Sequence, residues 1–170
     1  MSWPSHRNFP PTLIEHPFIS VHQDPIWREK SDYIIGIDLG PASAELPGQV
    51  TWEQLWARQV DDQTFEICCI PFHPYDLALG DTVETRDNAI VRRVAWGGHY
   101  TLRALFAAKN GPQMEVELEL RRLGALIEWS SDRLIGIDVD DARLADTVAG
   151  YLAGLESTGV LHWESGYTVH

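Results

Sequence analysis

Residues 100–167 read YTLRALFAAKNGPQMEVELELRRLGALIEWSSDRLIGIDVDDARLADTVAGYLAGLESTGVLHWESGY, and strand and helix patterns alternate along them. Tyr100–Ala107 alternates as a strand does and stops at the Asn-Gly-Pro of residues 110–112. A helical repeat follows to Gly124, and two strands flank the Ser-Ser-Asp of residues 130–132. A second helix ends at Gly159, before a final strand. This order predicts a ferredoxin-like βαββαβ layer, in which two helices cover one face of a sheet.

Each predicted helix carries its own start, stop and apolar stripe. Pro112 suits the first turn of the first helix, and Gly124 ends it. Asp140 or Asp141 is the expected N-cap of the second helix. The stripes that we expect to be buried are Val116, Leu120 and Leu123 in the first helix and Leu144, Val148, Leu152 and Leu155 in the second.

The residues before this layer have a different pattern. Residues 1–31 are rich in Pro and aromatic residues, which predicts an extended arm. Residues 32–97 predict a small five-stranded, β-barrel-like module, and Gly97-Gly98 joins it to the layer of residues 98–170. The fold class is therefore α+β. The five strands are predicted at Tyr33–Leu39, Trp52–Val60, Phe65–Ile70, Asp81–Arg86 and Ile90–Trp96.

Composition limits the classes of function. The chain has 170 residues, 44% of them hydrophobic, which excludes a disordered protein. A formal net charge of −12 argues against nucleic acid and suits a basic protein partner or simple solubility. The first residues lack a signal-peptide pattern, and no apolar run is long enough for a membrane helix. We expect a cytoplasmic protein in which the adjacent Cys68 and Cys69 are buried thiols.

Two groups of residues are candidate binding sites. His99 and Tyr100 follow two glycines at the joint between the modules, where Asp81 can orient the imidazole if the two meet. The alternative is a hinge in which His99 bonds a backbone carbonyl. Phe72, His73 and Tyr75 form the second group, in a segment that Pro71 and Pro74 restrain, which suits recognition by a rigid loop. The alternative there is a bulged connection anchored by Phe72.

Motifs for other chemistry are missing from the sequence. The seven His residues match no metal-ligand spacing, and there is no GxSxG or phosphate-binding loop. We therefore predict no catalytic residues, no metal and no cofactor, and lean against an enzyme. Acidic residues gather in the second half and form either a solvated surface or a face for a basic partner. They are Glu128, Asp132, Asp138, Asp140, Asp141, Asp146, Glu156 and Glu164.

Four strings together resemble a known family. They are WEQLW at residues 52–56, IPFHPYDLALGD at 70–81, GHYTLR at 98–103 and the stretch 137–167 that ends in HWESGY. Residues 33–167 resemble the bacterial domain-of-unknown-function family numbered 4265. This chain has Tyr100 where that family commonly has Ser. The resemblance implies an uncharacterised bacterial protein and brings no activity with it.

Two functions are compatible with these patterns. The first is a non-enzymatic cytoplasmic binding protein whose acidic surface docks and neutralises a basic protein, for example a toxin. The alternative is a small-molecule sensor or enzyme that uses the cleft between the two modules around His99, because pockets favour such junctions.

Overall fold

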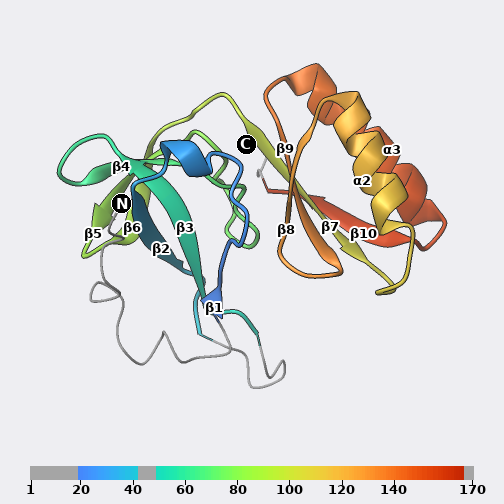
Figure 1. The fold of residues 1–170 in the computed structure, drawn as a ribbon, viewed down its shortest axis with the longest axis horizontal. Helices are drawn as coiled ribbons and strands as arrows, with labels where there is room; N and C mark the ends of the chain where they lie inside the picture. The colour runs from blue at the N-terminus through green and yellow to red at the C-terminus, as the bar shows by residue number, and fades with distance from the viewer. Residues whose placement is uncertain (1–18, 42–48, 167–170) are drawn as a thin grey trace.

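The computed structural model describes residues 19–41 and 49–166, in which two β-sheets lie side by side (Figure 1). The first sheet comes from residues 19–95, and the second sheet and the two α-helices of the described residues come from residues 100–165. The mixed α+β class predicted from the sequence is confirmed. Neither helix has the length and apolar content that crossing a membrane requires in the described chain.

The second sheet has four antiparallel strands in the order β10-β7-β9-β8. Its two helices cover the face that is turned away from the first sheet (Figure 1). The strands and helices follow each other along the chain in the predicted order. Their bounds are β7 Tyr100–Phe106, α2 Gln113–Leu123, β8 Leu126–Trp129, β9 Leu134–Val139, α3 Ala142–Ser157 and β10 Leu161–Ser165.

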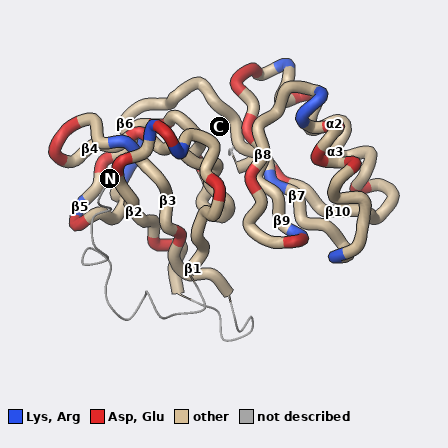
Figure 2. The backbone as a smooth tube through the Cα atoms, in the orientation of Figure 1, with Lys and Arg blue, Asp and Glu red and all other residues tan. Residues whose placement is uncertain are grey.

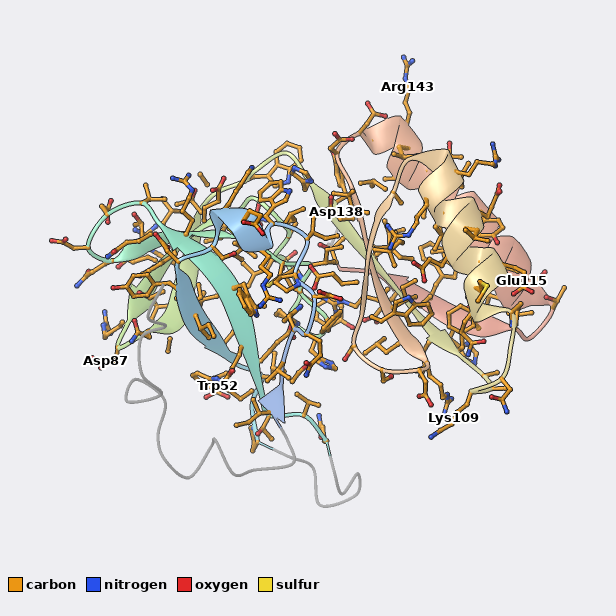
Figure 3. All side chains as sticks on the ribbon, viewed as in Figure 1. Trp52, Asp87, Lys109, Glu115, Asp138 and Arg143 are labelled. Atoms are coloured by element: carbon orange, nitrogen blue, oxygen red, sulfur yellow. The ribbon has the colours of Figure 1, made fainter. Side chains whose placement is uncertain are left out.

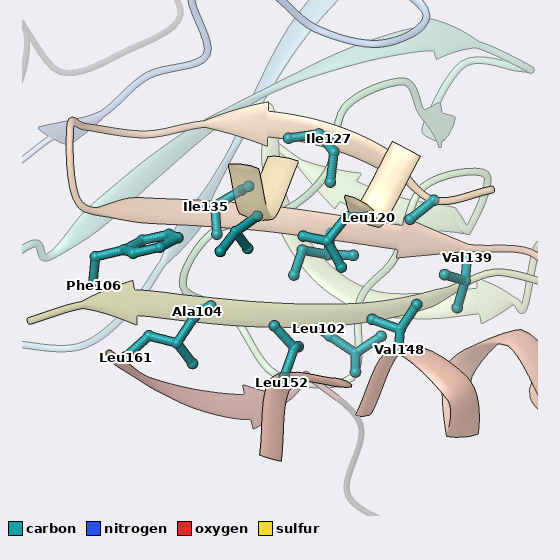
Figure 4. Packing of buried hydrophobic residues seen from close by; sticks show 13 residues of the cluster. Leu102, Ala104, Phe106, Leu120, Ile127, Ile135, Val139, Val148, Leu152 and Leu161 are labelled. Atoms are coloured by element: carbon teal, nitrogen blue, oxygen red, sulfur yellow. The ribbon is translucent and has the colours of Figure 1, made fainter. Parts of the chain in front are cut away.

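An apolar core fills the space between this sheet and its helices (Figure 4). Leu120 of α2 and Val148 and Leu152 of α3 are fully buried against Leu102, Phe106 and Ile137 of the strands. The predicted stripes of both helices are confirmed, with Leu123, Leu144 and Leu155 partly buried at their margins. Burying one such side chain fully stabilises the fold by about 1.5–3 kcal/mol before entropy.

The helix ends follow the sequence signals. Asp141, rather than Asp140, caps α3, because its carboxylate accepts hydrogen bonds from the amides of Arg143 and Leu144. Gly124 ends α2 with φ of 108°, a conformation that residues with a side chain rarely adopt.

The first sheet has six strands in the order β1-β3-β2-β6-β5-β4, and β3 also pairs with β4. These pairings make a ring, but the sheet is not the predicted five-stranded barrel. The ring closes between β2 and β6 at the single pair Gly36–Ala89, whereas a barrel needs continuous ladders. The bounds are β1 Ile19–Ser20, β2 Tyr33–Asp38, β3 Trp52–Gln59, β4 Thr64–Ile67, β5 Thr82–Arg86 and β6 Ala89–Ala95.

The sixth strand comes from the region predicted as an arm. Ile19–Ser20 pairs in parallel with β3, and a short 3₁₀ turn, η2 at Arg28–Lys30, precedes β2. The end of the predicted arm is therefore part of the fold. Residues 1–18 of the predicted arm lie outside the described residues.

The chain leaves the sheet after Ile67 and runs irregularly to β5, and we call residues 68–81 the connecting segment. It lies against the face of the second sheet that the helices leave uncovered. A methyl group on Gly136 of β9 would come within 3.0 Å of Ile70 and 3.2 Å of Phe72. Cys68 and Cys69 at its start are buried free thiols, as expected.

Candidate functional site

A pocket of about 810 Å³ lies at the junction of the two sheets. The end of β2 forms one wall, β7, β9 and β10 form the other, and the connecting segment lies between them. The sequence-predicted Phe72, His73 and Tyr75 all line the pocket. Its apolar lining also includes Ile37, Leu39, Val50, Leu105, Leu134 and Trp163.

Arg103 is the buried cation of this pocket, with 3% of its surface exposed. Alternation along β7 turns Leu102 and Ala104 to the helices and Arg103 to the connecting segment. The guanidinium Nη1 donates to the carbonyl of His73 at 2.9 Å, and Nη2 donates to the carbonyl of Pro74. Its Nε is buried and has no partner among the described residues.

Glu164 of β10 connects Arg103 with the pocket's exposed edge. One carboxylate oxygen lies 3.2 Å from Nη1 of Arg103, and the other accepts a 2.7 Å hydrogen bond from the Tyr75 hydroxyl. This hydrogen bond is the main reason that the pKa of Tyr75 is raised. The Glu164 side chain is 48% exposed, so this end of the cluster faces solvent.

His73 supplies a neutral polar group to the pocket wall. Burial lowers the pKa of its half-buried imidazole, against the attraction of Glu53. None of the described residues bonds its ring nitrogens, although its backbone amide donates to Glu53. A neutral imidazole has one donor and one acceptor, so His73 can offer both to a ligand.

His99 lies outside the pocket and is paired with a different acid from the one the sequence suggested. Its Nδ1 lies 2.7 Å from Oδ2 of Asp138, a buried residue of β9 at the junction of the two halves (Figure 3). The hydrogen bond that His99 donates to the Asp138 carboxylate raises the pKa of His99, against the effect of burial. The ring is therefore bonded to a carboxylate and not to a backbone carbonyl.

Asp81 and Tyr100 also lie away from the pocket. Asp81 is fully buried and accepts hydrogen bonds from the amides of Gly97 and Ala78, so it fixes the turns around β5 instead of orienting His99. Tyr100 packs edge-on against Trp96 at 5.4 Å between ring centroids. The structure thus divides the six predicted binding residues into a pocket group of three and a joint group of three.

A buried histidine between two glutamates was missed by the sequence analysis. His22 Nδ1 lies 2.6 Å from Glu128, and its Nε2 lies 2.9 Å from Glu53. The imidazole stacks on Phe72 with ring centroids 4.1 Å apart. Burial alone would lower the pKa of His22, but Cys69, Glu128 and Glu53 together raise it well above its ordinary value. Each ring nitrogen thus faces a carboxylate, and this arrangement favours the protonated, cationic imidazole.

The two glutamates also hold the backbone around the pocket. Glu53 accepts hydrogen bonds from the amides of Phe72 and His73, and Glu128 accepts from those of Ile26 and Ile70.

One sequence signal could have revealed this site. Glu53 occurs in phase with Leu55 and Ala57 on β3, which places a carboxylate among core residues.

The acidic residues of the second half are mostly engaged within the fold. Glu128 and Asp138 are buried, and Asp132, Glu156 and Glu164 lie beside Lys109, His162 and Arg103. Figure 2 shows Asp and Glu on both halves of the chain with Lys and Arg among them. The described residues contain no group of three or more His, Cys, Asp or Glu side chains that could hold a metal ion.

Comparisons with known proteins identify relatives without a known activity. A family model described as "Domain of unknown function (DUF4265)" matches residues 53–163, more than half of the chain. No curated protein matches the chain. A solved structure described as "Novel crystal structure of a hypothetical protein from Neisseria gonorrhoeae" is similar, with a TM-score of 0.65 and 16% identity. The match covers 79% of this chain and 93% of that one. At this identity the likeness shows the fold alone.

Proposed function

This chain belongs to the DUF4265 family, and we propose that it is a small-molecule-binding protein whose ligand site is the pocket at the junction of its two sheets. The observation that carries this proposal is the pocket itself. Its volume of about 810 Å³ lies in the range of about 300–1,000 Å³ that is usual for ligand sites. Junctions between structural units are also a preferred place for such sites.

The chemistry of the pocket wall supports the same function. Just over half of the lining residues are apolar or aromatic, and the polar ones include the linked group of Arg103, Glu164 and Tyr75. The other polar lining residues are Asp38, Gln49, His73 and His162. This combination gives binding area from the apolar part and orientation from the polar part. His99 does not line the pocket, so the proposed site rests on the group around His73 and not on the joint around His99.

A pocket-filling substitution tests the proposal. Leu105 lines the pocket and is 43% exposed, so Leu105→Trp adds bulk there without disturbing the core. Leu118→Trp on the exposed side of α2 is the matched control, because Leu118 is 62% exposed and does not line the pocket. Saturation-transfer NMR of a set of small acids, amides and amines would measure binding to each protein.

We expect some of these compounds to bind the wild type and Leu118→Trp and to lose binding to Leu105→Trp. If every compound that binds the wild type binds Leu105→Trp equally well, the pocket is not the ligand site. If no compound in the set binds the wild type, the proposal loses its main support.

A second candidate function is the docking of a basic protein partner. The formal net charge of −12 supports it, because a strongly acidic protein attracts cationic surfaces at long range. The exposed carboxylates Asp140 and Asp146, at the start of α3, are the natural contacts for such a partner.

Pull-down from lysate at low and high salt separates this candidate from the first. We expect wild-type protein to retain a basic partner at low salt, and an Asp140→Lys/Asp146→Lys double variant to lose it. Retention that is indifferent to both salt and the substitutions counts against the docking function. Leu105→Trp should leave this retention unchanged.

We also infer that the second sheet and its helices form a ferredoxin-like layer and that the protein is cytoplasmic. The strand order β10-β7-β9-β8 with antiparallel neighbours supports the first inference, because a split βαβ layer has this order. The free thiols Cys68 and Cys69 support the second, because reduced cysteines are typical of a reducing compartment.

A further inference from the structure

We infer that the ligand of the pocket is a small carboxylic acid with an apolar body, and that its carboxylate replaces Glu164 at Arg103. This inference rests on the proposed function and specifies the ligand class. It follows from three features of the site, namely a buried guanidinium, an exposed carboxylate that neutralises it, and an apolar wall beside both.

The first feature is the charge of Arg103. A buried cation is costly unless a negative charge and hydrogen-bond acceptors surround it. Two backbone carbonyls, of His73 and Pro74, satisfy part of the guanidinium, but a carbonyl carries no full charge. Among the described residues, Glu164 is the carboxylate paired with Arg103, and the Nε of Arg103 remains without a partner.

The second feature is that the two interactions of the Glu164 carboxylate are weak. Its carboxylate is 3.2 Å from Nη1, a long contact for a charged pair, and its side chain is 48% exposed. Its other hydrogen bond comes from Tyr75, which is 54% exposed. The pair joins a buried guanidinium to a half-exposed carboxylate, so Glu164 can turn outward into water at small cost once another carboxylate takes its place at Arg103.

The third feature is the surface beside Arg103. Leu105 and Leu134, which are register partners on β7 and β9, give an apolar wall that suits a hydrocarbon or aromatic body. The other carboxylate of the pocket, Asp38, already accepts a hydrogen bond from the amide of Gly40. A bound carboxylate would bring an acceptor to the guanidinium in a less exposed place than the one that Glu164 occupies, and such a charge-assisted bond is stronger where water is excluded.

The test compares two probes with the same ring system by titration calorimetry, the charged 1-naphthoate and the neutral 1-naphthamide. We expect the wild type to bind the acid about tenfold or more tightly than the amide, because a hydrogen bond to a charged group is worth about 1.5–3 kcal/mol. Glu164→Gln should tighten the acid by about two- to fivefold and leave the amide unchanged, since it removes the competing carboxylate. Arg103→Met should abolish the preference for the acid.

Glu119→Gln is the matched control, because Glu119 forms an ion pair with Arg122 on α2, which covers the opposite face of the second sheet, and does not line the pocket. It should change neither affinity. Glu164→Gln keeps the test decisive even if Arg103→Met does not fold. Equal binding of acid and amide, or an unchanged acid affinity in Glu164→Gln, overturns the ligand class and leaves the pocket function standing. Failure of both probes to bind also overturns the ligand class, and the compound set with Leu105→Trp then decides the pocket function separately.

Discussion

Charged and polar side chains form hydrogen bonds that connect the two halves of this chain. His22 lies between Glu53 of the first sheet and Glu128 of the second, and His99 pairs with Asp138 of the second. Thr101 and Arg103 of β7 bond carbonyls of the connecting segment. The part of the second sheet that faces the connecting segment is therefore polar and buried, and its hydrogen bonds cross to the first half.

Removal of the His22 imidazole should destabilise the fold strongly. His22→Ala leaves Glu53 and Glu128 buried without a cation, which costs about 3–5 kcal/mol. Urea unfolding would measure the change in the free energy of unfolding. His162→Ala is the control, because His162 contacts Glu156 with 85% of its side chain exposed and should cost less than about 1 kcal/mol. Similar losses for the two variants would show that His22 is not the buried cation described above.

The stabilisation by His22 should also depend on pH. The pKa of His22 is raised in the folded state, whereas an unfolded histidine titrates near about 6.5. Its contribution is therefore fully present below that pH and is lost as pH rises through the folded pKa. We expect the stability difference between wild type and His22→Ala to shrink from pH 6 toward pH 9. The groups that face His22 are Glu53, Glu128 and Cys69, and a difference that grows with pH would contradict the assignment.

At the scale of elements, close contact between β9 and the connecting segment limits which residues β9 can carry. Gly136→Ala would place a methyl group 3.0 Å from Ile70, and we expect a loss of about 1–3 kcal/mol. Gly150 of α3 has open space around it, so Gly150→Ala should stabilise by about 0.5–1 kcal/mol through helix propensity. Thermal unfolding of both variants would measure the two opposite shifts. A stabilising Gly136→Ala would be evidence against this packing.

The elements themselves were well predicted because their signals are local. Strand alternation, the apolar stripes of α2 and α3, the cap at Asp141 and the end at Gly124 are all set by residues close in sequence. The ring of the first sheet was not predictable in the same way, because β2 and β6 meet at one pair that depends on long-range packing. The short pairing of β1 with β3 gave no sequence signal either.

The candidate site was predicted in part for the same reason. Phe72, His73 and Tyr75 were found because prolines restrain their segment. Arg103 and Glu128 were not identified as buried, since a polar residue that alternates with apolar ones in an antiparallel strand usually faces water. The sequence places Asp138 among the acidic residues of the second half, and only the fold brings it to His99.

At the scale of the whole molecule, Glu128 connects the N-terminal segment, the connecting segment and the second sheet. We expect Glu128→Gln to weaken this junction while the second sheet keeps its own core. Amide hydrogen exchange, measured residue by residue, would show whether only the junction is weakened. The amides of Ile26 and Ile70 should exchange much faster, and those between β7 and β9 should remain protected. Loss of protection in both places together would mean that the two halves unfold as one unit.

The polar junction also determines how the pocket can respond to a guest. Apolar surfaces can shift relative to each other with little change in energy. Hydrogen bonds between carboxylates, imidazoles and amides are directional, so they fix one relative position of the two surfaces. One wall of the pocket belongs to β2 and the other to β7, β9 and β10, so these bonds fix the gap between them. If the pocket binds a ligand as proposed, we expect its two walls to keep their distance on binding, so that only side chains at its edge, such as Glu164, need to move.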